Sequence, residues 1–342
     1  MHNYHSAHDE FPAGWEQTKL PSNRHYRIAG TAMLLPYIEQ NQLYSLIMEH
    51  PERHPWDHTN DPANNDVSPY ITPIPAFRCP SDGTSYPNNQ HQPTNYRMNR
   101  GDTPTERSWD ESRHNHRGLF GSGRLGPFTM ASMSDGTSNT MAFAEGVIVS
   151  DSNSEQVVGG IALGQETALD QANGMINRPI NWLSVRGSGK SFRVGVITPS
   201  ATGYASDHTP YSRGLGRRWG DGNNTFASVW TILPPNSPAV CRLTDPGDNI
   251  EVWTIVPPSS YHPGGVGTVA GDGSYRYVSD SVDTSSSPPP RKSGITATGL
   301  SLAYGEIQGV DNDDDVRGYT GPSPWGVWGA YGSKAGGEST SL

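Results

Sequence analysis

Residues 267–279 read GTVAGDGSYRYVS, and this stretch predicts a β-hairpin in the C-terminal part of the chain. Asp272-Gly273 is the preferred central pair of a two-residue type I′ turn, because both central positions of that turn need a positive φ. Tyr275 and Tyr277 then share one face of the second strand. The turn also sets the register in which the two strands pair.

The predicted register places a histidine at the base of the hairpin. With Gly271 opposite Ser274, His262 falls opposite Asp283 and close to Asp280. We therefore expect the His262 ring to bond one of these two carboxylates and to have a structural role. A metal-binding or catalytic histidine is the alternative interpretation.

The composition is typical of many short strands joined by tight turns. The 342 residues include 39 Gly and 29 Pro, while only 17% are charged and 33% hydrophobic. This balance leaves little room for long helices. Nine Trp and fifteen Tyr are spread along the chain and argue against disorder. We expect one large β-rich unit.

The charge and the hydropathy exclude some classes of protein. The formal net charge is −10 and Lys and Arg do not cluster, so nucleic acid is not an expected partner. No apolar run approaches the roughly 20 residues that span a bilayer, and no signal-peptide pattern follows Met1. Taken alone, these features are those of a cytoplasmic protein.

Helical patterns occur in the N-terminal part. Residues 1–10 predict the last turns of a helix that ends before Pro12. Residues 28–49 predict one helix, because apolar residues recur at near-helical spacing and Pro36 would start or kink it. Strand patterns follow at 141–144, 147–149, 193–198, 226–233 and 251–256.

No motif of the chain carries catalytic chemistry. GSGKS at 187–191 resembles part of a phosphate-binding loop, but Ser184 stands where that loop needs its first glycine. SDGTSNT at 134–140 predicts a turn that leads into a strand, in preference to a hydroxyl-rich catalytic loop. We therefore expect no catalytic or cofactor-binding residues and a protein that is not an enzyme.

Three aspartates near the C-terminus suggest a cation site. Asp311, Asp313 and Asp315 stand at alternate positions, as in the first part of an EF-hand loop. Val316 and Pro322 replace the glycine and the glutamate that such a loop needs. A looser Ca²⁺ site and a solvated acidic loop remain as two interpretations, and if the protein binds a metal we expect Ca²⁺ here.

Two further sets of residues recur at regular spacing. His2, His5 and His8 would share one face of the N-terminal helix, where exposed histidines are a better interpretation than a metal cluster. Large aromatic residues recur every third position near the C-terminus, and they either stack on sugars or belong to the core. These aromatic residues are Trp325, Trp328 and Tyr331.

Eight segments, in order along the chain, resemble one known family. They are HNYHSAHDEFPAGW at 2–15, LLPYIEQNQLY at 34–44, RCPSDG at 78–83, TNY at 94–96, SDGTSNTMAFAEG at 134–146, LPPNSPAVC at 233–241, YHPGGVGTVAGDGSYRYVSDSVD at 261–283 and WGAYGSKAGGE at 328–338. Together they resemble the planctomycete-type family known as domain of unknown function 1559. Its members begin with a prepilin-type segment and end with a signature of His, nine residues and Asp-Gly. In this chain that signature corresponds to His262 and Asp272-Gly273.

The resemblance implies an α+β, pilin-like fold, in which an N-terminal helix remnant packs on an antiparallel sheet with large β-rich and loop insertions. It implies a single head domain over 1–342, with a helical part (1–50), a β-rich and loop insertion (51–260) and a C-terminal hairpin and aromatic tail (261–342). It also implies an apolar membrane helix ahead of the HNYH segment, which we expect in the full-length precursor. The expected location is the cell envelope, on its periplasmic or extracellular side.

The function implied by the resemblance is a structural or adhesive subunit of an assembly like a type IV pilus or a type II secretion pseudopilus. An extracellular carbohydrate-binding module is the alternative. Other pilin-like subunits are the expected partners of such a subunit, whereas a carbohydrate-binding module would bind polysaccharide. We expect contact with the membrane only through the missing N-terminal helix. We expect the head alone to be a monomer, because its acidic surface repels a second copy.

The chain has two cysteines, Cys79 and Cys241. Residue types alone allow either one long-range disulfide or two buried thiols. The envelope location that the resemblance implies is oxidising, so we expect a disulfide between them.

Overall fold

The computed structural model describes the parts of the chain that form the central sheet and its cover. The described ranges are 1–16, 27–50, 53–56, 60–61, 66–86, 90–102, 117–121, 128–148, 160–162, 215–241, 254–285 and 321–338, with the single positions 123, 126, 158, 180, 183 and 342. The predicted strand at 193–198 and the aspartates at 311–315 lie outside these ranges.

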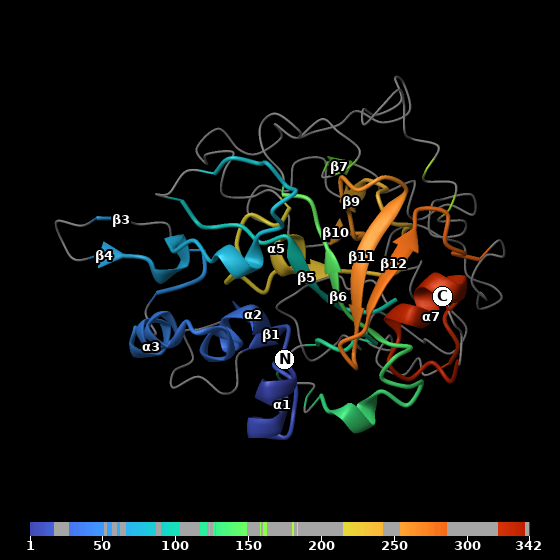
Figure 1. The fold of residues 1–342 in the computed structure, drawn as a ribbon, viewed down its shortest axis with the longest axis horizontal. Coiled ribbons are helices and arrows are strands. Elements are labelled where there is room, and N and C mark those ends of the chain that lie inside the picture. The colour runs from blue at the N-terminus through green and yellow to red at the C-terminus, as the bar shows by residue number, and fades with distance from the viewer. Residues whose placement is uncertain are drawn as a thin grey trace, which may run out of the picture.

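A five-stranded sheet forms the centre of the described structure (Figure 1). Its order is β12-β11-β6-β5-β8, and only β5 and β8 run parallel to each other. The bounds are β5 (Tyr96–Asn99), β6 (Met141–Glu145), β8 (Ser228–Val229), β11 (Gly265–Ala270) and β12 (Tyr275–Ser279). The expected α+β class is confirmed, and the sheet is mixed where the expectation was a purely antiparallel one.

The remaining strands form small sheets. They are β1 (Trp15–Glu16) with β2 (Ile28–Ala29), β3 (Asn60–Asp61) with β4 (Asp66–Val67), and β10 (Thr254–Ile255) with β9 (Ala239–Cys241) and β7 (Ile161–Ala162). Thus the strand expected at 141–144 is present as β6, whereas the one expected at 226–233 is reduced to the two residues of β8. Residues 147–148 lie outside any strand.

The helices of the described residues are short. The α-helices are α1 (His2–His8), α2 (Gly30–Met33), α3 (Asn41–Glu49), α5 (Asn224–Ala227) and α7 (Gly326–Gly332). The 3₁₀ helices are η1 (Leu35–Ile38), η3 (Pro69–Ile71), η4 (Pro75–Phe77) and η6 (Met130–Ser132). Within the described part of the chain, no helix combines the length and the apolar character that crossing a bilayer requires.

The hairpin of β11 and β12 forms as predicted, but its turn differs. Val269 pairs with Tyr275, so residues 271–273 make a three-residue loop in place of a two-residue one. Of this loop only Gly273 has a positive φ, of 89°. Asp272 favours the longer loop, because its carboxylate accepts hydrogen bonds from the amide and the hydroxyl of Ser274, at 2.8 and 2.6 Å. The predicted type I′ register is therefore wrong by one residue.

The single helix expected over 28–49 is also wrong. The chain runs instead from β2 through α2 and η1 into α3. Pro36 lies at the start of η1, where its missing N–H cannot extend the hydrogen bonds of α2, and Glu39 ends η1 with a left-handed φ of 65°. The apolar residues still share one buried cluster, which includes Leu35, Ile47 and Trp219. The spacing therefore reflected a common core and not a continuous helix.

The helix expected within residues 1–10 is confirmed as α1, which ends where Asp9 adopts a left-handed φ of 57°. Its histidine rings contact different parts of the chain. His2 Nε2 lies 2.8 Å from the carbonyl of Gly271 in the hairpin loop, and His5 Nε2 accepts a hydrogen bond from the amide of Met130 at 3.3 Å. In Figure 1 α1 accordingly lies below the sheet, near the turn of β11 and β12.

The aromatic residues of the C-terminal part belong to the core. Trp325, Trp328 and Tyr331 are 2%, 0% and 1% exposed, so they cannot stack on a sugar. The indole of Trp328 donates to the carbonyl of Leu233 at 2.8 Å. Of the two interpretations of this repeat, core packing is the correct one.

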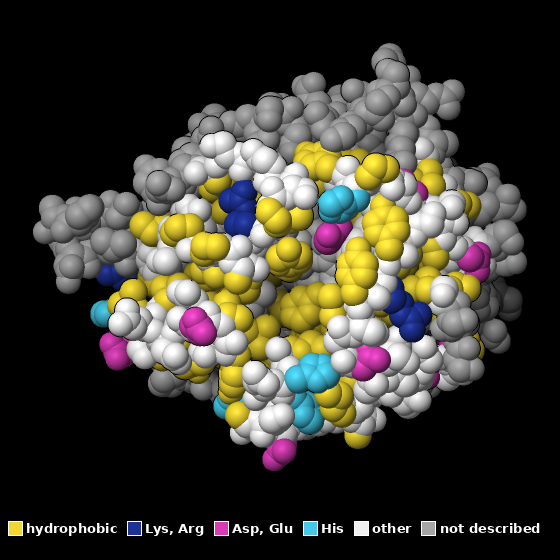
Figure 2. Space-filling model, in the orientation of Figure 1, with side chains coloured by type: hydrophobic (Ala, Val, Ile, Leu, Met, Phe, Trp, Pro, Cys, Tyr) yellow, Lys and Arg dark blue, Asp and Glu magenta, His cyan; other side chains and the backbone are white. Residues whose placement is uncertain are grey.

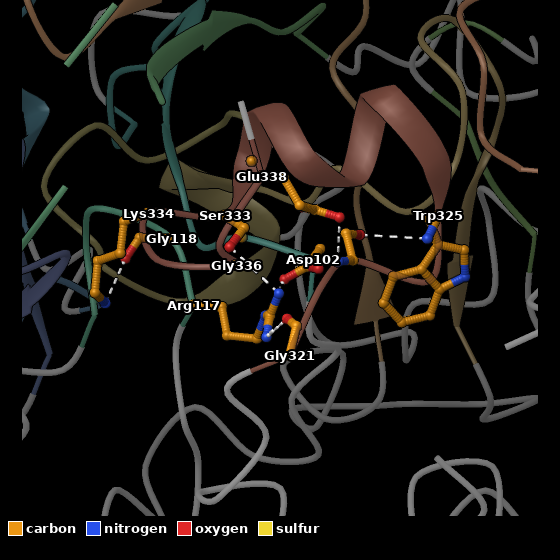
Figure 3. A network of polar contacts seen from close by, with 12 residues as sticks. Asp102, Arg117, Gly118, Gly321, Trp325, Ser333, Lys334, Gly336 and Glu338 are labelled. Atoms are coloured by element: carbon orange, nitrogen blue, oxygen red, sulfur yellow. Dashed lines mark hydrogen bonds and ion pairs between the residues drawn. The ribbon is translucent and has the colours of Figure 1, made fainter. Parts of the chain in front are cut away.

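A buried ion pair fastens this C-terminal part to the sheet (Figure 3). Asp102 follows β5, and its carboxylate accepts from Arg117 Nε at 2.7 Å, with both side chains almost fully buried. The same guanidinium donates to the carbonyl of Gly321 and to the hydroxyl of Ser333, at 2.8 and 3.3 Å. Lys334 adds a bond from its ammonium to the carbonyl of Gly118 at 2.9 Å, and burial lowers its pKa to about 8.

This arrangement predicts a large effect for Arg117→Met. The substitution leaves the Asp102 carboxylate charged and buried without its guanidinium, and breaking a buried pair in this way costs about 3–5 kcal/mol. Chemical denaturation should show the free energy of unfolding reduced by that amount. Removing both charges, in Asp102→Asn with Arg117→Met, should cost less than Arg117→Met alone.

The matched control is Arg276→Met. Arg276 is a half-buried arginine of β12 whose guanidinium lies 5.7 Å from the centre of the Tyr331 ring. Its loss should reduce the stability by about 1 kcal/mol or less. Equal effects of the two arginine substitutions would show that the Asp102 pair is not what fastens the C-terminal part.

Candidate functional site

A pocket opens beside the central sheet, where the end of β6 meets the segment that leads into β11. Its volume is about 130 Å³, and four separate segments line it. In Figure 2 a histidine lies next to an acidic side chain near the middle of the visible face, and hydrophobic rings over β11 and β12 lie beside them. The lining segments are 79–82, Asn95, 145–147 and 259–262.

Three side chains with different donor atoms converge on this pocket. One donor atom each from Cys79, Glu145 and His262 lies within 4.8 Å of the other two. His262 Nε2 is 3.8 Å from Glu145 Oε1. The His262 side chain is 42% exposed and that of Glu145 is 18% exposed, so the group is open to solvent on one side.

The cysteine is held by a buried asparagine. Asn95, which precedes β5, accepts a hydrogen bond from the amide of Cys79 at 2.9 Å. Its side-chain amide donates to Asp82 at 2.6 Å and to the carbonyl of Gly146 at 3.1 Å. Asn95 therefore ties the loop of Cys79 to the end of β6, where Glu145 lies.

Charged groups behind the pocket keep this loop in place. The Asp82 carboxylate also accepts from the amide and hydroxyl of Thr84, at 3.1 and 2.6 Å, and from the amide of Ile148 at 3.2 Å. Arg97 of β5 is fully buried and donates to the carbonyl of Val147 at 2.6 Å. Burial lowers the pKa of Arg97 to about 10, and the attraction of Asp82 opposes this shift.

Glu145 is oriented by the neighbouring strand. It ends β6, and its Oε2 accepts a hydrogen bond from the amide of Gly267 in β11 at 2.8 Å. A side chain at position 267 would disturb it, because a Cβ atom there would lie 2.9 Å from Glu145 Cδ and 3.0 Å from the ring of Tyr275. Glycine at 267 thus leaves the room that the carboxylate occupies, with Oε1 directed toward His262.

His262 does not have the partner that we predicted. The shifted register of the hairpin removes the expected pairing with Asp283 or Asp280, and Glu145 is the carboxylate that reaches the ring among the described residues. Asp283 instead accepts from the amides of Ser285 and Val327. Asp280 accepts from the side-chain amide of Asn236 at 2.7 Å.

The backbone on both sides of His262 is fixed by hydrogen bonds. The His262 amide donates to the hydroxyl of Ser260 at 3.1 Å. The hydroxyl of Tyr277 donates to the carbonyl of Pro263 at 2.6 Å. The imidazole is therefore presented to the pocket from a segment anchored to β12.

Cys79 is a free thiol, so the predicted disulfide with Cys241 is wrong. The reason lies in the placement of the two residues. Cys79 faces the pocket with Glu145 and His262, whereas Cys241 belongs to β9 in a separate three-stranded sheet. Burial raises the pKa of the neighbouring Tyr96, and its proximity to Cys79 and Glu145 raises it further.

Sequence reasoning singled out Cys79 and His262 for other roles and did not single out Glu145. The signal was present in the segments that carry the family resemblance. Four of them, at 78–83, 94–96, 134–146 and 261–283, supply Cys79, Asn95, Glu145 and His262 to this one pocket. The expected calcium ligands Asp311, Asp313 and Asp315 lie outside the described residues.

Comparisons with known proteins identify a family and nothing closer. Neither the curated proteins nor the solved structures include a significant match to this chain. Residues 1–285 match the family SBP_bac_10, described as "Protein of unknown function (DUF1559)". The match spans every segment that lines the pocket and the whole β11–β12 hairpin. On this match over most of its length, the chain belongs to the DUF1559 family.

Proposed function

We propose that the protein is a structural or adhesive subunit of a pilus- or pseudopilus-like assembly in the cell envelope, exposed on the periplasmic or extracellular side. The observation that carries this proposal is the docking of α1 against the loop of the β11–β12 hairpin, against η6 and into a buried cluster. In an assembly of this kind the N-terminal helix positions the head, so the helix must be fixed rigidly to it. Family membership supports the same function through the prepilin-type segment that the resemblance implies.

The docking of α1 uses both apolar and polar contacts. Tyr4 is 4% exposed and packs in the cluster that contains Ile28 and Trp219. Met1 packs against two buried clusters of the described residues. His2 and His5 add hydrogen bonds to the hairpin loop and to η6. A force on α1 would therefore be transmitted to the hairpin loop, to η6 and to these clusters.

The partners in this proposal are other pilin-like subunits. The isolated head has a net charge of −10 and would self-repel, so assembly would depend on a helix ahead of α1. Light scattering on the isolated head should accordingly report a monomer.

The first test follows the full-length gene product in its own cells. We expect the tagged protein in the sheared surface fraction together with other pilin-like proteins, and we expect its precursor to remain unprocessed when the prepilin peptidase is deleted. Tyr4→Ala should reduce incorporation, because α1 loses its buried anchor and the truncation of a buried aromatic costs about 3–5 kcal/mol. Asn3→Ala changes an exposed position of the same helix and serves as the control.

Thermal melting of the two head variants separates lost docking from general unfolding. A full-length protein that stays in the cytoplasmic fraction, or whose size does not depend on the peptidase, would contradict the proposed function.

Carbohydrate binding is a second candidate function, and one observation favours it. Tyr275 and Tyr277 share the outer face of β12 and are 66% and 48% exposed. They flank the pocket, since Glu145 lies against Gly267, the residue that pairs with Tyr277. Exposed aromatic rings beside polar groups can stack on a sugar ring while the polar groups bond its hydroxyls.

A glycan array with the purified head tests this second function. If the head binds polysaccharide, Tyr275→Ala and Tyr277→Ala should each weaken the binding about tenfold or more. Leu46→Ala removes another exposed apolar side chain, on α3, and should leave binding unchanged. A wild-type head that binds no glycan on the array eliminates this candidate.

A further inference from the structure

We infer that Cys79, Glu145 and His262 form a binding site for a divalent transition-metal ion, with Zn²⁺ as the ion that best suits their donors. This site goes beyond the proposed envelope function and does not depend on it. Sulfur, nitrogen and oxygen donors from three distant segments meet at one point, and nothing in the composition of the chain requires them to do so.

The spacing of the donors is close to that of metal ligands. An ion with bonds of about 2.0–2.3 Å to N, O and S holds tetrahedral ligand atoms about 3.3–3.8 Å apart. His262 Nε2 and Glu145 Oε1 are already 3.8 Å apart, and all three donors lie within 4.8 Å of one another. To bind one ion, the donor atoms would have to move closer by about 1 Å.

The types of donor select the class of ion. A thiolate and an imidazole favour borderline and soft cations, whereas Ca²⁺ and Mg²⁺ require oxygen ligands. Three protein ligands with one open side are typical of zinc sites that keep a fourth position for water or another ligand. The open side here is the pocket mouth, where the His262 ring is 42% exposed.

Two of the three donor residues are held in place by groups that do not compete for the metal. The amide of Gly267 bonds Glu145 Oε2 and leaves Oε1 for the ion. Asn95 bonds the backbone amide of Cys79, and this bond does not involve the sulfur. Such hydrogen bonds to ligand residues orient them and raise metal affinity, commonly by 10- to 100-fold.

A cysteine nucleophile activated by histidine is the competing interpretation of the same residues. In such a relay the thiol and the carboxylate bond opposite nitrogens of the imidazole. Here one ring nitrogen lies within 4.8 Å of both the thiol sulfur and a carboxylate oxygen. Convergence on a single point suits an ion and does not suit a relay through the ring.

Titration of the chelator-treated protein tests the site, with Zn²⁺ and Co²⁺ as the probes. We expect one equivalent of Zn²⁺ to bind and to raise the melting temperature, and we expect Co²⁺ to give a thiolate-to-cobalt charge-transfer band. Cys79→Ser should abolish the band, and Glu145→Gln and His262→Ala should each weaken Zn²⁺ binding about 100-fold or more. His8→Ala, at an exposed position of α1, is the histidine control and should bind normally.

A pair of glycine substitutions tests the site without removing any donor. Gly267→Ala places a methyl group 2.9 Å from Glu145 Cδ and should lower Zn²⁺ affinity about 10- to 100-fold by displacing the carboxylate. Gly83→Ala, in the loop after Cys79, places its methyl group in open space and should leave the affinity unchanged. Circular dichroism of the metal-free variants checks that each one folds.

Three results would overturn the inference. The first is a folded wild-type protein that binds no Zn²⁺ at micromolar concentration. The second is a charge-transfer band that survives Cys79→Ser or disappears in Cys241→Ser. The third is stoichiometric acylation of Cys79 by an activated ester, with loss of the acylation in His262→Ala and no bound metal, which would assign the residues to thiol chemistry.

Discussion

The row of buried polar side chains on β5 and its flanks is the feature on which the rest of the structure depends. Arg97, Asn99 and Arg100 are at most 1% exposed, and each donates to backbone carbonyls of other segments of the chain. Arg100 bonds the carbonyls of Phe120 and Gly222, and Asn99 bonds those of Met141 and Gly332. Buried carbonyls need such donors, and a chain rich in Gly and Pro has few regular elements to supply them. A central strand of long polar side chains does so here, although burial lowers the pKa of Arg100 to about 9.

The same row explains where the pocket lies. Asn95 stands at the beginning of β5 and bonds the Cys79 amide, while Arg97 bonds Val147 just beyond Glu145. An alanine methyl at position 146 would collide with the Arg97 guanidinium, so the chain can pass Arg97 this closely just after Glu145 only with glycine at 146. The strand that organises the loops therefore also sets the separation between the thiol and the carboxylate. The hydrogen bonds of Asn95 therefore serve both the fold and the site. A substitution at Asn95 would disturb the loop packing and the pocket together.

Sequence patterns predicted the elements whose causes are local. The hairpin at 265–279 follows from alternating residues around a turn, and α1 follows from a helical stretch that ends before Pro12. Patterns failed where a side-chain hydrogen bond within a turn or a contact with a remote segment decided the outcome. The turn at 271–273 takes three residues because the Asp272 carboxylate bonds Ser274, and that one residue changes the partner of His262. The split of 28–49 follows from Pro36 and from the left-handed turn at Glu39, while the apolar spacing that suggested one helix reflects a shared cluster around Trp219, which is remote in sequence.

Glu145 could not be identified from the sequence for a related reason. A glutamate at the end of a strand is ordinarily a solvated residue. Glu145 belongs to the site because the amide of Gly267 on the neighbouring strand orients its carboxylate and because His262 lies close to it. Cys79 was misinterpreted because the disulfide was inferred from the oxidising location that the resemblance implies, whereas the fold places Cys79 beside the pocket and Cys241 in β9 of a separate sheet. Family segments that are far apart in the chain and whose residues meet in one pocket were the better guide.

A free thiol has a consequence for the proposed location in the envelope. In an oxidising compartment an exposed thiolate is open to disulfide exchange and to oxidation toward sulfenic acid. Cys79 is half-buried beside a pocket mouth, so burial alone does not protect it. Coordination to a d¹⁰ ion such as Zn²⁺ would occupy the sulfur lone pair without redox chemistry of its own. The proposed location and the inferred metal site are thus physically compatible, because the ion would allow an unpaired cysteine to persist where a disulfide would otherwise be expected.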